Sequence, residues 1–60
     1  MKKYRVMFEI HNEDGSKQYM DIFVEAGNRK MATLRAMSEI SKNEKYKNLF
    51  KNVKEISEVA

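Results

Sequence analysis

The residues of this chain best suited to chemistry lie together in one short polar stretch, His11-Asn12-Glu13-Asp14. An imidazole beside carboxylates can act as a general base, provided that it is held within reach of a substrate proton. However, His11 is the only His, and the chain has no Cys. These counts exclude a thiol nucleophile, a disulfide, a thiolate metal site and a histidine-rich metal site.

The expected surroundings of His11 argue against catalysis. Asp14-Gly15 is a strong turn dipeptide, because Gly adopts a positive φ at no steric cost. His11, Glu13 and Asp14 should therefore lie at a hairpin tip, where no pocket shifts their pKa values. The chain also lacks a Gly-rich phosphate loop. We expect a solvated turn, no enzymatic activity, and no bound metal or cofactor.

Basic residues suggest a second kind of chemistry, contact with phosphate groups. The chain has 12 Lys and Arg against 9 Asp and Glu, a net charge of +3. Nucleic-acid binding requires such residues to gather on one surface. The candidate contacts are Lys3, Arg29, Lys30 and Arg35. Acidic residues share the predicted sheet face with Lys3, which favours scattered solubilising charge over a nucleic-acid site.

A β-hairpin is the element that must position these residues. Residues 3–11 and 17–26 alternate between two faces and are rich in β-branched and aromatic side chains, as in half-buried strands. One face of the hairpin suits burial under a helix. Its residues are Tyr4, Val6, Phe8, Ile10, Met20, Ile22, Val24 and Ala26.

Residues 29–42 favour a helix, and Asn28 is a suitable N-cap because its side-chain oxygen can accept a bond from a free backbone N–H. The two alanines of the apolar stripe would let the helix lie close to the sheet. Met31 points away from that stripe, toward solvent. The stripe consists of Ala32, Ala36, Met37 and Ile40.

Residues 46–60 allow two structures. Their apolar residues recur with helical periodicity, and Ser41-x-x-Glu44 matches a capping box. A third strand over 52–59 would instead enlarge a sheet that is otherwise too small to be stable. The spacing of its apolar residues would then require a bulge. We favour a single α+β domain over residues 1–60 with ββαβ order, and ββαα is the alternative.

This succession of segments resembles a known type of protein. The resemblance is carried by Lys3–Phe8, Asp14-Gly15, Ile22–Ala26, Ala32-x-x-x-Ala36 and Val53-x-x-Ile56-x-x-Val59. It is similar to small ββαβ proteins of bacteriophages and mobile elements, including the DpnD/PcfM-like group. No catalytic motif accompanies the pattern, and the tail departs from it where helical periodicity competes. The resemblance implies a protein that binds a host protein, such as a defence protein, and modulates or inhibits it.

The hairpin face opposite the helix carries Met7, Tyr19 and Phe23. Full burial of each side chain contributes about 1.5–3 kcal/mol, and a core of this size seldom supplies more than about 3–5 kcal/mol. Leaving all three in water is therefore unfavourable. Either they form an interface, or the tail covers them through Leu49 and Phe50.

If the face is an interface, Arg5, Glu9 and Asp21 are its expected polar rim. The leading hypothesis is a cytoplasmic, non-enzymatic interaction protein that forms a homodimer and binds a host protein. The alternative is a small nucleic-acid-binding regulator. No apolar run approaches the roughly 18 residues of a membrane span, and no signal-peptide core follows the basic start. We therefore expect no membrane association.

Overall fold

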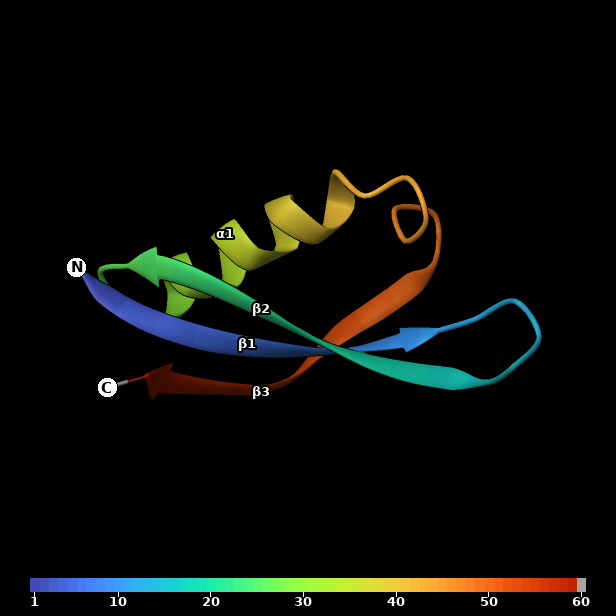
Figure 1. Ribbon diagram of the computed structural model, residues 1–60, viewed down its shortest axis with the longest axis horizontal. Coiled ribbons are helices and arrows are strands. Elements are labelled where there is room, and N and C mark those ends of the chain that lie inside the picture. The colour runs from blue at the N-terminus through green and yellow to red at the C-terminus, as the bar shows by residue number, and fades with distance from the viewer. Residues whose placement is uncertain (60) are drawn as a thin grey trace.

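A three-stranded antiparallel sheet with one helix on one side makes up the computed structural model, which describes residues 1–59 (Figure 1). The elements are β1 (Lys2–His11), β2 (Lys17–Ala26), α1 (Arg29–Ser41) and β3 (Phe50–Val59). The strand order β2-β1-β3 places β1 at the centre. The predicted α+β fold with ββαβ order is confirmed, and the ββαα alternative is wrong.

The hairpin forms as predicted. β1 and β2 pair without a register shift, from Lys2 opposite Ala26 to His11 opposite Lys17. At the turn, Gly15 has a φ of +90°, a conformation that Gly adopts without strain. The backbone N–H of Ser16 donates to Asp14 Oδ1 at 2.9 Å, which closes the turn.

Residues 50–59 form a strand because pairing with the free edge of β1 stabilises the sheet. A two-stranded hairpin is marginal in water, whereas β3 pairs with the free edge of β1 and adds apolar residues to the core. The register shifts opposite Met7 and Phe8, so that Lys54 is the extra residue of a bulge. The bulge required by the strand prediction is thus present.

Helix α1 begins as predicted, since Asn28 Oδ1 accepts a hydrogen bond from the N–H of Met31 at 2.9 Å. It ends at Ser41, and the N–H of Lys42 bonds the carbonyl of Glu39 at 3.2 Å. The capping box proposed from Ser41 is therefore wrong, because residues 43–49 form a loop. Within residues 1–59, no helix is long and apolar enough to cross a membrane.

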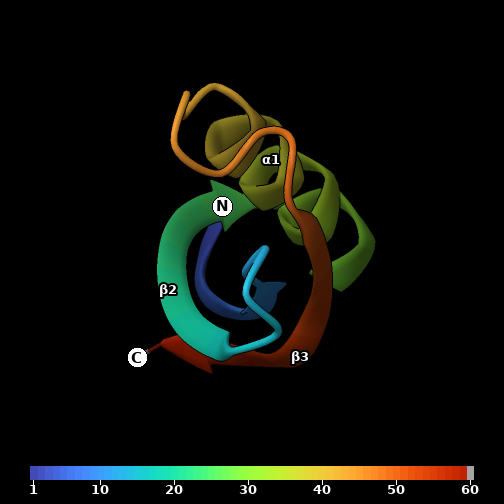
Figure 2. The same cartoon turned by 90° about the vertical axis from the view of Figure 1, so that its right-hand side faces the viewer.

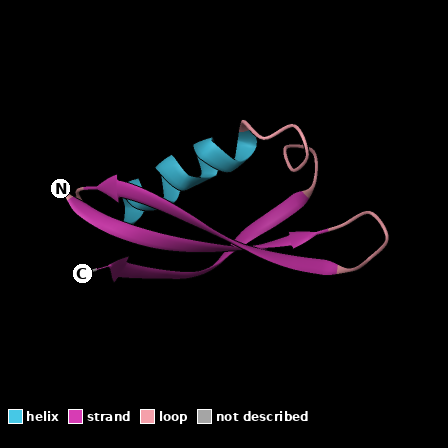
Figure 3. Ribbon diagram, viewed as in Figure 1, coloured by secondary structure: helices cyan, strands magenta, loops and turns pink. Residues whose placement is uncertain are grey.

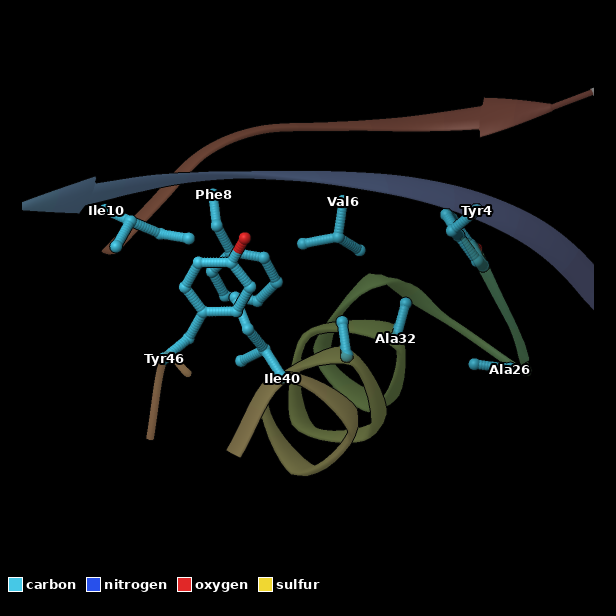
Figure 4. Packing of buried hydrophobic residues seen from close by; sticks show 9 residues of the cluster. Tyr4, Val6, Phe8, Ile10, Ala26, Ala32, Ile40 and Tyr46 are labelled. Atoms are coloured by element: carbon cyan, nitrogen blue, oxygen red, sulfur yellow. The ribbon is translucent and has the colours of Figure 1, made fainter. Parts of the chain in front are cut away.

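The core lies between α1 and one face of the sheet, here called the inner face (Figure 4). Ala32 and Ala36 are fully buried, as expected for a helix lying close to a sheet. Tyr46, from the loop before β3, closes one end of the core over Phe8 and Ile40. The buried apolar residues are Tyr4, Val6, Phe8, Ile10, Ala26, Ala32, Ala36, Ile40 and Tyr46.

The strands twist strongly, and α1 runs along only one side of them (Figure 2, Figure 3). The opposite side of the sheet, here called the outer face, is covered by no other element of residues 1–59. Any surface that the sheet offers to a partner therefore lies on the outer face or along the edges of β2 and β3.

Candidate protein interface

The outer face is built by the alternation of side chains along the strands. Successive residues of a strand point to opposite faces, so the odd-numbered residues of 3–11 and 17–25 share the outer face. The register with β1 adds residues from β3. These are Phe50, Asn52, Glu55, Ser57 and Val59.

Tyr19 and Phe23 lie on this face with 56% and 59% of their surface exposed. The tail does not cover them, because β3 extends the sheet on the far side of β1. Leu49 packs against the core instead. Phe50 joins the outer face at the opposite edge, where its ring meets His11 edge-on at 5.0 Å. The cover by Leu49 and Phe50 that the sequence allowed is therefore wrong.

Met7 shares the outer face as predicted, but it does not form a continuous apolar patch with the two aromatic rings. It is half-buried in the central strand, and its cross-strand neighbours are Asp21 and Glu55. The neighbour of Phe23 is Arg5. Charged side chains thus separate the apolar ones.

Arg5 and Asp21 were expected at the rim; Arg5 lies on the central strand β1, and Asp21 lies on the edge strand β2. The Arg5 guanidinium lies 2.8 Å from Glu55 Oε1 and 3.9 Å from Asp21 Oδ2. The three residues come from three different strands, so they form an ionic strip across the sheet. Glu55 was missed by the sequence analysis, because its partner depends on the register of β3.

Glu9 is the one buried charged residue among residues 1–59, with 8% of its surface exposed. His11 Nε2 lies 2.8 Å from Glu9 Oε1, and the Tyr19 hydroxyl donates to Oε2 at 3.3 Å. Lys54, from the bulge, approaches Oε2 at 4.0 Å. The hydrogen bond with His11, with help from nearby Lys and Tyr groups, lowers the pKa of Glu9. The sequence predicts Glu9 only as a rim residue, although the alternation along β1 also places it beside His11.

This cluster predicts an acid-sensitive contribution to stability. A carboxyl group whose pKa is lower in the folded chain stabilises the fold above its unfolded pKa, about 4.3 for Glu, and loses that effect as the pH falls through the folded value. Glu9→Gln should therefore show a smaller loss of unfolding free energy than the wild type between about pH 6 and pH 3. Urea titrations followed by circular dichroism measure this. Equal losses in both proteins would show that Glu9 makes no such contribution.

The residues considered for catalysis are arranged differently from the expectation. His11 is half-buried at the end of β1 and bonds Glu9, rather than lying in a solvated turn with Glu13 and Asp14. Asp14 accepts bonds from Ser16, which lower its pKa. Among residues 1–59, no group of three His, Asp or Glu side chains is placed to bind a metal.

The four candidate nucleic-acid contacts are not brought together. Arg29 donates to the carbonyl of Ile56 at 3.0 Å, at one edge of the sheet, and Arg35 donates to the carbonyl of Glu25 at 3.1 Å, at the other. Lys30 is exposed on the first turn of α1, and Lys3 lies on the outer face between β2 and β3. These positions do not make one basic surface, which weakens the nucleic-acid alternative.

A groove of about 590 Å³ lies between α1 and β2. Its apolar floor includes Met20 and Ile22, which are only half-buried, and its helical wall carries Arg35, Ser38 and Glu39. This groove could not be predicted from the sequence, because it depends on where α1 lies across the sheet. The helix therefore leaves the β2 side of the sheet partly open.

Comparisons of the chain with protein-family models, with curated proteins and with solved structures gave no match. The resemblance to the DpnD/PcfM-like group stays a prediction. The features of the chain that bear on its function are therefore the outer face and the edge strands that bound it.

Proposed function

We propose that this chain is a non-enzymatic protein-interaction module that acts as a homodimer and binds a partner protein through the outer face of its sheet. One observation carries the proposal. Tyr19 and Phe23 keep more than half of their surface exposed, on a face that nothing in residues 1–59 covers. Aromatic residues of this kind are enriched at protein interfaces, where they bury a large area against the partner.

The charges of the outer face favour a specific contact over non-specific hydrophobic association. Phe23 lies beside Arg5, and Tyr19 lies beside Glu9. Both charged groups are already held by ion pairs or hydrogen bonds, so a partner meets them in a fixed arrangement. A partner that fits this face supplies apolar side chains for the two rings and polar groups that match the ionic strip.

The class of partner is inferred from the resemblance to small phage and mobile-element proteins. That resemblance supports a host protein as the partner, with modulation or inhibition as the result. The module would then act by occupying a surface of the host protein, without making or breaking a covalent bond.

The test compares two apolar residues that are equally exposed on opposite sides of the molecule. Phe23 is 59% exposed on the outer face, and Leu34 is 57% exposed on α1. Each is replaced by Asp, and the immobilised proteins are used to capture partners from host lysate. We expect Phe23→Asp to weaken capture about 30-fold, as for a central interface residue, and Leu34→Asp to leave it unchanged.

A second variant controls for unfolding, and one outcome would contradict the proposal. Asp is unfavourable in strands, so Phe23→Thr is included because Thr favours them, and it should also lose capture while its circular dichroism spectrum matches the wild type. A partner retained equally by the wild type, Phe23→Thr and Leu34→Asp does not bind through the outer face, and the proposal would then be wrong.

A further inference from the structure

The two edges of the sheet are protected to different degrees. On β3, the bulge at Lys54 interrupts the strand, and Arg29 occupies the outward carbonyl of Ile56. On β2, ten residues pair with β1 without any shift, so that the other side of the strand is a regular edge. A long regular edge presents unpaired N–H and C=O groups that can accept another strand, and bulges are a usual protection against this.

The hydrogen bond from Arg35 identifies which groups face outward on β2. It reaches the carbonyl of Glu25, and backbone groups of alternate residues point to opposite edges of a strand. The N–H and C=O groups of the odd-numbered residues, from Lys17 to Glu25, therefore face the free edge. Within residues 1–59, this bond is the only one found there, and it lies at the end of the strand.

We propose that β2 pairs antiparallel with β2 of a second copy, about a two-fold axis that passes beside Asp21. Two three-stranded sheets would then join into one continuous sheet. The inference rests on the proposed function, because it supplies the geometry of the homodimer. A second copy of this chain is the expected partner at the free edge of β2, because the side chains of β2 are complementary to those of an antiparallel β2.

This register pairs opposite charges and aromatic rings across the axis. Lys17 lies opposite the partner subunit's Glu25, and Tyr19 lies opposite the partner subunit's Phe23. Each pair occurs twice because of the symmetry. Opposite charges and aromatic rings are favourable cross-strand neighbours on a sheet face. The rings would form two aromatic pairs on the outer face, one on each side of the two Asp21 side chains, and each ring, whose neighbour on β1 is charged, would gain an aromatic neighbour across the interface.

Other positions of the two-fold axis along β2 lack this complementarity. Moving the axis by one residue, to Met20 or Ile22, places Tyr19 opposite an acidic residue and removes both charge pairs. With the axis beside Asp21, Met20 lies opposite the partner subunit's Ile22 on the inner face, so the apolar floor of the groove continues across the interface. The one unfavourable contact is that between the two Asp21 carboxylates, and each of them has the Arg5 of its own chain at 3.9 Å.

Sedimentation equilibrium of the purified chain tests the pairing and its register. We expect Lys17→Glu and Glu25→Lys each to raise the dimer Kd about tenfold, because each creates two like-charge pairs. The double variant, which exchanges the charges, should return to within about threefold of the wild type. Asp21→Asn should lower the Kd about fivefold, since it removes the central repulsion. Lys30→Glu makes the same charge change on α1 and should leave the Kd unaltered.

Two results would overturn the inference. A wild-type chain that stays monomeric up to about 1 mM, the weak end of measurable affinity, has no such dimer. A double variant that dimerises as poorly as either single variant, while its circular dichroism spectrum matches the wild type, excludes the register. Neither result involves a partner protein: a monomer that still loses capture on Phe23→Thr contradicts the homodimer and leaves partner binding in place, whereas a dimer that captures nothing contradicts partner binding and leaves the pairing in place.

Discussion

Phe8→Ala is expected to leave the chain largely unfolded at room temperature. Phe8 lies in the central strand β1, and its side chain is fully buried between the sheet and α1. Removing a buried aromatic ring costs about 3–5 kcal/mol, since apolar contacts are lost and a cavity remains. A single core in a chain of this size supplies about the same amount. One substitution therefore removes nearly the whole free energy of unfolding.

The chain contains its own controls for this experiment. Phe23→Ala and Phe50→Ala delete the same ring at positions that are 59% and 64% exposed, and each should change the free energy of unfolding by less than about 1 kcal/mol. Urea unfolding followed by circular dichroism, at concentrations too low for self-association, gives the three values. If Phe8→Ala unfolds at the same urea concentration as the two controls, the core does not lie between β1 and α1.

Tyr46→Ala is expected to have the second largest effect, a loss of about 3 kcal/mol. Tyr46 belongs to the loop between α1 and β3, yet it is only 7% exposed because its ring closes the core over Phe8 and Ile40. The loop is held in place by Lys51, whose ammonium group donates to the carbonyls of Tyr46 and Leu49 at 3.1 and 3.0 Å. The ring is therefore a fixed part of the core.

Tyr46→Phe separates the role of the ring from that of the hydroxyl group. The hydrogen bonds found for Tyr46 within residues 1–59 involve its backbone N–H and carbonyl, so Phe should keep the free energy of unfolding within about 1 kcal/mol of the wild type. Urea unfolding of both variants measures the difference. Equal stability of Tyr46→Ala and Tyr46→Phe would show that the ring does not close the core.

Much of the candidate interface could be predicted from alternation alone. A period of two places Met7, Tyr19 and Phe23 on one face, because neighbouring residues of a strand point to opposite sides. Their exposure could not be predicted in the same way. It depends on β3, which extends the sheet beyond β1, leaves the outer face uncovered and brings Glu55 against Arg5.

Glu9 is a single residue whose face and whose neighbour His11, but not its burial, could be predicted from alternation. Burial follows from the surrounding groups, since Tyr19 reaches it from β2 and Lys54 from the bulge in β3. A carboxylate is tolerated there because hydrogen bonds and a nearby ammonium group replace the lost water.

By itself, the sequence determined the hairpin, its turn and the start of the helix. Each depends on interactions between residues close in the chain: alternation along the strands, the positive φ of Gly15, and the bond from Asn28 to the first turn of α1. Only the tertiary structure decided that residues 50–59 form a strand, against their helical periodicity. The free backbone groups of β1 form hydrogen bonds with β3, which is distant in the chain, and β3 adds apolar residues to the inner face. That pairing also determines which side and which edges of the sheet are open to a partner.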